Sequence, residues 1–179
     1  MAGQNPRGDA PAAASAVVRL EAYDRSEILG DDADPFGVAE WGLVWLPKEH
    51  HFGIRDGHRL VAHAGLLVVP LSVGGRRMDV VGVGGVAVAA DRRGRGLAAR
   101  VVNGAVEHAR ALGHEFALLF CRPGVAGLYG RLGWREVDAA VEVEQPAGVA
   151  VMPLRTMWFP LREGSRWPEG PVRLRSHPM

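Results

Sequence analysis

The chain has 179 residues, of which 47% are hydrophobic and 23% are charged, and its formal net charge is +1 at pH 7. This length is enough for one domain with a sizeable core, and the balanced charge argues against general binding of nucleic acid or of a membrane surface. No run approaches the roughly 18 apolar residues that a membrane-spanning helix needs. The single cysteine, Cys121, excludes an intramolecular disulfide, so we expect a reducing, cytoplasmic location.

The N-terminal part of the chain is poor in regular patterns. Residues 1–15 are rich in Ala, Gly, Pro and Ser, which predicts a disordered tail before a single domain over residues 16–179. A weak alternation predicts a first strand over residues 16–20, and residues 26–29 can begin a short helix.

An acidic, turn-rich segment comes next, and its acidic residues are Asp31, Asp32, Asp34 and Glu40. Composition alone favours a solvated loop, whereas the functional interpretation is a mouth that attracts a cationic ligand. Trp41 follows directly, four residues before Trp45, a spacing more typical of packing than of binding.

Two hairpins follow. Asp56-Gly57 joins a strand over residues 50–55 to one over residues 59–69, and Gly74-Gly75 joins residues 66–73 to residues 76–88. Four histidines lie in the first hairpin, but strand alternation puts some of them on opposite faces, so we predict no metal site. In the last strand Gly82, Gly84 and Gly85 indicate a bulge, the close approach of a ligand, or tight packing beneath a helix.

A basic turn after this strand is the strongest functional signal. Its sequence is Arg93-Gly94-Arg95-Gly96-Leu97-Ala98, and an apolar stripe over residues 97–112 predicts that a helix begins within it. The first turn of a helix presents unpaired N–H groups and a partial positive charge. Together with two arginines, these groups predict a cradle for a diphosphate.

The remaining patterns complete an α+β chain. We predict a buried strand over residues 115–121, a helix over 125–132, a strand over 134–144, a strand over 149–161 interrupted by Pro153, and an extended tail over 162–179. Cys121 is then a buried small hydrophobe rather than a nucleophile. A helix between two strands predicts a parallel pair within a mixed, mostly antiparallel sheet with helices on both faces.

Several of these residues together resemble the GNAT superfamily of N-acetyltransferases. The residues that carry the resemblance are Arg93, Gly96 and Ala98 in the turn, Val86-Ala87-Val88 before it, and Leu128-Tyr129 with Gly133-Trp134 after it. The resemblance implies the GNAT fold, acetyl-CoA as cosubstrate without a metal, and, as is usual in the family, a homodimer.

Within the superfamily the chain looks most like the aminoglycoside 2'-N-acetyltransferases. The segments that support this are Val61-Ala62-His63-Ala64, Gly85-Val86-Ala87-Val88, Ala90-Asp91, and Trp167 with Gly170. The resemblance implies a small cationic acceptor such as a kanamycin- or kasugamycin-like amine. Alternatives are another small amine, a peptide, or a non-catalytic acyl-CoA-binding module.

The resemblance also implies roles for individual residues. The residues that would bind the diphosphate are Arg93, Gly94, Arg95, Gly96, Leu97 and Ala98. The pantetheine arm would bind the backbone of Val86, Ala87 and Val88. The implied catalytic groups are the Val86 N–H, which would polarise the thioester oxygen, and Tyr129, which would protonate the leaving thiolate. The residues that would contact the acceptor are Asp32, Asp34, Glu40, Trp41, Gly84, Glu142 and Glu169. Gly84 stands where the related enzymes carry a carboxylate, so the base stays open between Glu40, Glu142, Glu144 and a bound water.

Overall fold

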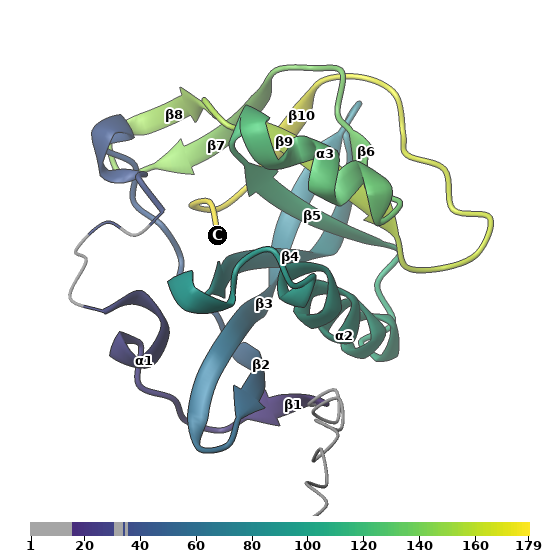
Figure 1. Ribbon diagram of the computed structural model, residues 1–179. Coiled ribbons are helices and arrows are strands. Elements are labelled where there is room, and N and C mark those ends of the chain that lie inside the picture. Colours follow the sequence, from purple (N-terminus) through teal and green to yellow (C-terminus); the bar gives the residue numbers. More distant parts are fainter. Residues whose placement is uncertain (1–15, 31–33, 35) are drawn as a thin grey trace, which may run out of the picture.

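The computed structural model describes residues 16–30, 34 and 36–179, and in this part of the chain the strands form one curled mixed sheet (Figure 1). Along the sheet the strands run in the order β6-β9-β5-β4-β3-β10-β7-β8, and β1 and β2 extend it from β3. The strands are β1 (Val17–Leu20), β2 (His50–Asp56), β3 (Arg59–Val73), β4 (Arg76–Val88), β5 (Phe116–Cys121), β6 (Arg135–Glu136), β7 (Val141–Gln145), β8 (Gly148–Val151), β9 (Arg155–Pro160) and β10 (Val172–Leu174).

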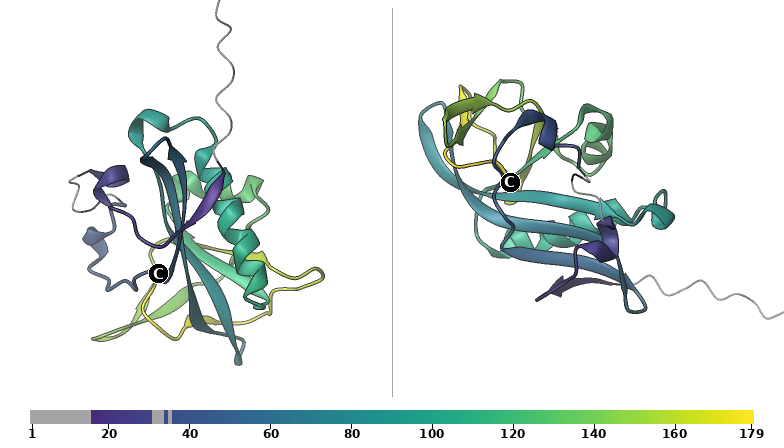
Figure 2. Two further views of the ribbon diagram at one scale, coloured as in Figure 1. Left: turned by 90° about the horizontal axis from the view of Figure 1, so that it is seen from below. Right: turned by 90° about the vertical axis from the view of Figure 1, so that its left-hand side faces the viewer.

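Helices cover both faces of this sheet (Figure 2). One face carries α2 (Leu97–Ala111) and α3 (Pro123–Arg131), and the other carries the short α1 (Ser26–Leu29) and the 3-10 turn η1 (Ala39–Trp41). Successive strand residues belong to different cores: Leu119 packs with the α2 side, and Leu118 with the opposite side. This arrangement confirms the predicted α+β architecture, a mixed sheet with helices on both faces.

The two predicted hairpins are confirmed, and they share one long strand. β3 pairs antiparallel with β2 through the turn after Asp56 and with β4 through Gly74-Gly75. The opposite edge of β3 pairs with two strands, because β2 begins with His50 opposite Leu66 and β10 ends with Leu174 opposite Leu71. β3 is therefore the frame that joins the two halves of the sheet.

β4 and β5 form the predicted parallel pair, but only briefly. They pair over three positions, from Val81 opposite Ala117 to Val83 opposite Leu119. Beyond Val83, β4 carries a bulge, because the register moves from Gly84 opposite Gly65 to Ala87 opposite His63. The extra residue bends β4, and the two strands separate beyond this point.

Two predicted strands were wrong in extent. The strand predicted over residues 134–144 is split into β6 and β7, and β6 pairs with β9 whereas β7 pairs with β10. The strand predicted over 149–161 is split around Pro153 into β8 and β9, which pair with β7 and β5. A hydrophobic pattern in the sequence carries no information on which strand a segment pairs with. Pro153 also lacks the N–H that a continuous ladder needs.

Part of the predicted extended tail belongs to the sheet. β10 lies between β3 and β7, antiparallel to the first and parallel to the second. Its side chains Val172 and Leu174 are buried in the core on the side away from α2. In the part of the chain that the structure describes, no helix has the length and apolar character needed to cross a bilayer.

We predict that Leu174→Ala destabilises the protein by about 2–4 kcal/mol, because Leu174 has no exposed surface and truncation would leave a cavity between β3 and β7. Unfolding in urea measures the change. Val151→Ala is the control, since Val151 is 63% exposed and its truncation should cost less than about 0.5 kcal/mol. Equal effects of the two substitutions would show that β10 does not contribute to the core.

Candidate active site

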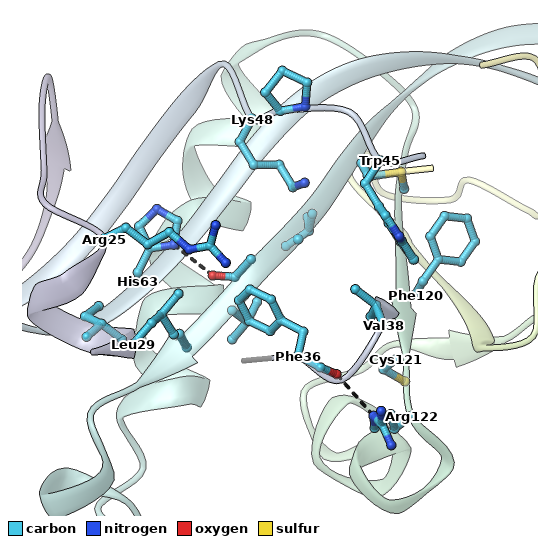
Figure 3. A pocket seen from close by; sticks show the side chains of 18 of the residues that line it. Arg25, Leu29, Phe36, Val38, Trp45, Lys48, His63, Phe120, Cys121 and Arg122 are labelled. Atoms are coloured by element: carbon cyan, nitrogen blue, oxygen red, sulfur yellow. Dashed lines mark hydrogen bonds between the residues drawn. The ribbon is translucent and has the colours of Figure 1, made fainter. Parts of the chain in front are cut away.

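A cavity of about 880 Å³ opens where β4 and β5 separate (Figure 3). Its wall combines the α1 segment, the loop before β2, the bulge of β4, the end of β5 and one face of α3. Lining residues that carry chemistry are Arg25, Lys48, His51, His63, Cys121 and Tyr129. The cavity thus places titratable side chains from separate parts of the sequence next to the backbone of β4.

His63 holds the bulge of β4. Its ring nitrogen Nδ1 lies 2.8 Å from the carbonyl oxygen of Gly85, which has a φ of +60° that favours glycine. The carbonyl only accepts, so Nδ1 carries the proton. Because the peptide bond is trans, the Val86 N–H of the same unit points away from His63. The bulge therefore turns the Val86 N–H away from the direction that it would have in a regular strand.

A second imidazole orients the first. His51 Nδ1 lies 3.0 Å from His63 Nε2, and the ring of Tyr23 stacks on His63 at 4.5 Å between centroids. Since Nδ1 of His63 donates to Gly85, its Nε2 accepts from His51 Nδ1, and the free lone pair lies on His51 Nε2. Burial lowers the pKa of both imidazoles, that of His63 to about 4. Both are therefore neutral at pH 7.

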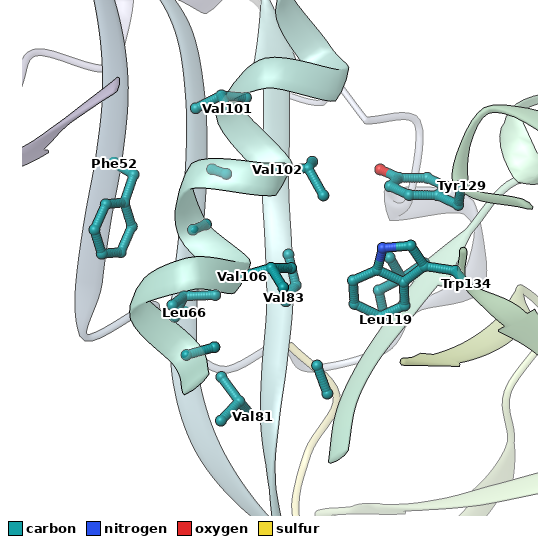
Figure 4. Packing of buried hydrophobic residues seen from close by; sticks show 14 of the residues in the cluster. Phe52, Leu66, Val81, Val83, Val101, Val102, Val106, Leu119, Tyr129 and Trp134 are labelled. Atoms are coloured by element: carbon teal, nitrogen blue, oxygen red, sulfur yellow. The ribbon is translucent and has the colours of Figure 1, made fainter. Parts of the chain in front are cut away.

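Tyr129 reaches the cavity from α3, which confirms the expected helix one to two residues earlier than predicted, with Pro123 at its start. Its ring packs edge-on to Trp134 at 6.2 Å in the core beside α2, and only 7% of the residue is exposed (Figure 4). Burial raises the pKa of its phenol to about 12. The hydroxyl is therefore protonated at neutral pH, and among the described residues it has no hydrogen-bond partner.

Cys121 lies close to Tyr129 but is an unreactive thiol. Its Sγ lies 3.8 Å from the Met157 sulfur, and burial raises its pKa to about 11. The prediction that Cys121 is a buried small hydrophobe is confirmed.

The basic turn lies at the N-terminus of α2, as expected. Residues 93–96 are exposed, Gly94 and Gly96 have φ values of +76° and +71°, and no side chain caps the helix. The N–H groups of Leu97 and Ala98 are then available to a ligand, and the side chains of Arg93 and Arg95 lie beside them in the sequence. This arrangement could hold an anion such as a diphosphate.

The residues expected to contact the acceptor are not brought together. Asp34 accepts the backbone N–H groups of Val38 and Ala39 at 2.8 and 2.9 Å. Glu40 is paired with Arg122 at 3.5 Å, and that guanidinium lies over the ring of Trp41 at 5.3 Å. These acidic groups therefore hold the loop that contains η1 in place, and of them only Asp34 lines the cavity.

The other expected acceptor contacts lie elsewhere. Glu142 is exposed on β7, and Glu169 lies beside the Gly74 turn at the opposite end of β3 from His63. Gly84 does line the cavity, whereas Asp32 lies outside the described residues. Over residues 16–30, 34 and 36–179, no three His, Cys, Asp or Glu side chains gather as a metal site requires.

Comparison with known proteins identifies the fold. A family model described as an acetyltransferase (GNAT) domain matches residues 32–137. The chain belongs to the GNAT acetyltransferase family. A comparison with curated proteins gives no match.

Solved structures of GNAT proteins share this architecture at low sequence identity. The GNAT family N-acetyltransferase YhbS from Escherichia coli, in complex with CoA, is 18% identical with a TM-score of 0.61, and the match covers 93% of this chain and 92% of that one. The ribosomal-protein-S18-alanine N-acetyltransferase from Escherichia coli is 18% identical with a TM-score of 0.57, over 86% and 99% of the chains. A mutant AtaT toxin bound to the C-terminus of the antitoxin AtaR and acetyl-CoA is 13% identical with a TM-score of 0.56, over 83% and 94%. These similarities confirm the GNAT fold.

The sequence analysis missed the basic side chains of this GNAT cavity. Lys48 and Arg25 lie in segments without a motif, and no local pattern predicts that they face β4. His63 lies within a segment that carries the family resemblance, but its partner is the carbonyl of a bulge. Pairing of Gly65 with Gly84 across the second hairpin was the available signal, because two opposed glycines leave room for a side chain from elsewhere.

We predict that the protein loses stability as the pH falls from 6.5 toward 4, by up to about 3 kcal/mol from His63 alone. The unfolded chain binds a proton at this imidazole near pH 6.5, whereas the folded protein does so only near pH 4. Urea unfolding between pH 4.5 and 7 measures the slope.

His63→Gln should flatten this slope, whereas His58→Gln, at an exposed turn position, should leave it unchanged. An unchanged slope in the His63 variant would show that the imidazole does not stay neutral in the folded protein.

Proposed function

We propose that this GNAT protein transfers the acetyl group of acetyl-CoA to a primary amine of a small molecule bound in the cavity beside β4. The observation that carries the proposal is the convergence, at the separation of β4 and β5, of a turned-out Val86 peptide, a protonated Tyr129 and a neutral imidazole pair. Acetyl transfer to nitrogen needs a donor to an oxygen, a proton donor to sulfur and a proton acceptor for the amine.

The residues that would hold acetyl-CoA fit that molecule. The turn over residues 93–98 offers α2 N–H groups and two exposed arginines to the diphosphate. The backbone of Val86, Ala87 and Val88 borders the separation of β4 from β5 and would pair with the pantetheine amides. When bound there, acetyl-CoA supplies an acetyl group on a thioester.

The chemistry assigned to this chain is proton transfer and polarisation. A bond forms between the acceptor nitrogen and the acetyl carbon, and the bond from that carbon to the CoA sulfur breaks. The Val86 N–H would polarise the thioester oxygen, a contribution of about 3 kcal/mol for one such donor. Tyr129 would give its phenolic proton to the departing sulfur, since burial keeps that proton in place until the thiolate forms.

His51 is the proton acceptor that we assign to the amine. The base was left open between carboxylates and water, but Glu142 and Glu144 lie on β7 and Glu40 is paired with Arg122. His51 lines the cavity, its pKa is lowered by burial, and its Nε2 has the free lone pair. The proton taken from the amine would leave through this imidazole to solvent.

The identity of the acceptor is the open part of this function. An aminoglycoside acceptor, which the resemblance implies, is less well supported, because most charged side chains that line the cavity in the described part of the chain are basic. A peptide acceptor and a non-catalytic acyl-CoA-binding module are two further candidates. The expected homodimer stays a prediction.

We predict that Tyr129→Phe lowers turnover at least tenfold while the affinity for acetyl-CoA changes less than twofold, because the ring packing is kept and only the proton donor is lost. Release of CoA thiol during an amine screen measures turnover, and calorimetry measures acetyl-CoA binding.

A matched control for this experiment is Tyr23→Phe, whose hydroxyl has no assigned role and whose ring stacking on His63 is kept. Loss of turnover and of affinity in equal measure would show that Tyr129 only packs. Acetyl-CoA binding without thiol release, for every amine and in the unmodified protein, would support the non-catalytic module instead.

A further inference from the structure

Lys48 lies in a slot made by two opposed glycines. Gly65 and Gly84 face each other across β3 and β4. A Cβ atom at Gly65 would meet Lys48 Cγ at 2.5 Å, and one at Gly84 would meet Lys48 Cε at 2.6 Å and Nζ at 3.2 Å. The lysine side chain therefore occupies the space of the two missing side chains, and its amine lies where a side chain of residue 84 would begin.

In this slot the Lys48 amine reaches the cavity but is largely shielded from water. Burial lowers the pKa of Lys48 to about 8. Its hydrogen-bond partner is the Leu46 carbonyl at 3.2 Å, and no carboxylate lies within ion-pair distance of it among the described residues. The α-carboxyl carbon of Met179 lies 3.2 Å from the same Cβ position on Gly84, but this carboxyl group forms no ion pair with Lys48. A buried ammonium group without an anion is costly, so an anionic ligand is favoured here.

Arg25 adds a second positive charge to the same space. It precedes α1, lines the cavity, and extends toward it from the side opposite Trp45, whereas Lys48 enters from the loop before β2 (Figure 3). No ion pair of Arg25 is found in the part of the chain that the structure describes. The two cations come from separate segments and line the same cavity.

The other charged side chains that line the cavity, among the described residues, already have partners. Arg122 donates to the carbonyls of Phe36 and Gly37 and pairs with Glu40. Asp34 accepts two backbone N–H groups of the same loop. His51 and His63 are neutral at pH 7. Among the described side chains that line the cavity, Lys48 and Arg25 are therefore the two cations without an ion pair.

We propose that the acceptor is a small amine that also carries an anionic group, of which a carboxylate is the simplest, and that Lys48 and Arg25 bind this group. The inference rests on the proposed acetyl transfer and names the chemical class of its acceptor. The anion would neutralise the amine of Lys48 in its slot and hold the acceptor nitrogen over the Val86 peptide. Charge complementarity of this kind also discriminates against polycationic acceptors.

The test compares matched amines with and without an anionic group. Amino acids are paired with their carboxamides, and phosphoethanolamine with ethanolamine, in an assay of CoA thiol release. We expect kcat/KM to be at least tenfold higher for the anionic member of at least one pair, mainly through KM. Calorimetric binding of the same pairs gives a second measure that does not require turnover. The two kinds of pair distinguish a carboxylate from a phosphate.

Variants of Lys48 and Arg25 connect the preference to these side chains. Lys48→Met and Arg25→Gln should each reduce the preference for the anionic member at least fivefold, with little effect on the uncharged one. Lys48→Arg keeps the charge and should keep most of the preference. Arg77→Gln, an exposed change near the distant end of β4, is the control and should change neither.

The outcomes separate this inference from the proposed function. Equal use or equal binding of charged and uncharged amines, or best use of a kanamycin-like polyamine, would overturn the anionic acceptor and leave acetyl transfer standing. An anion preference that survives Lys48→Met and Arg25→Gln would overturn the assigned residues. Absence of acetyl-CoA binding and of thiol release with any amine would instead overturn the proposed function.

Discussion

The separation of β4 from β5 is the constraint on which the rest of the site depends. Two parallel strands would normally continue to pair, but here pairing stops after Val83. The bulge opposite Ala64 adds one residue to β4, and the positive φ of Gly85 lets its carbonyl turn to His63. One local irregularity thus creates the space for the cavity and removes a peptide from the regular ladder. Without the bulge, β4 would continue the regular ladder, and neither the space nor the turned peptide would be present.

The frame around this irregularity is made by contacts distant in sequence. β3 pairs along one edge with β4 and along the other with β2 and β10, which holds both ends of the bulged strand in register. The C-terminal segment then returns over the sheet, where the Pro178 carbonyl accepts the Leu46 N–H at 2.7 Å. Gly82 allows this approach, since a Cβ there would meet Met179 Cγ at 2.7 Å. Segments 45–48 and 178–179 are therefore held against each other at the cavity wall.

Local chemistry decides how much of this arrangement can be predicted from the sequence. The hairpins and the basic turn were predictable, because Asp56-Gly57, Gly74-Gly75 and the glycines of residues 93–98 act on their own neighbours. The split of residues 134–144 was not, because alternation is the same whichever strand a segment pairs with. The site residues show the same difference between local and long-range information. Tyr129 was found through its motif, whereas Lys48 was missed because its slot exists only when Gly65 and Gly84 face each other.

The glycine at position 84 and the entry of Lys48 depend on each other. A side chain on Gly84 would collide with the lysine, so the slot accepts either an acidic residue on β4 or the amine from the preceding loop. Of the acidic residues described in the adjoining loop, Asp34 accepts hydrogen bonds from backbone N–H groups and Glu40 pairs with Arg122, and both interactions hold the loop around η1. The charge presented to a ligand therefore depends on which charged side chains already have partners within the fold. An abundance of acidic residues in the sequence of a cavity wall does not make the cavity acidic.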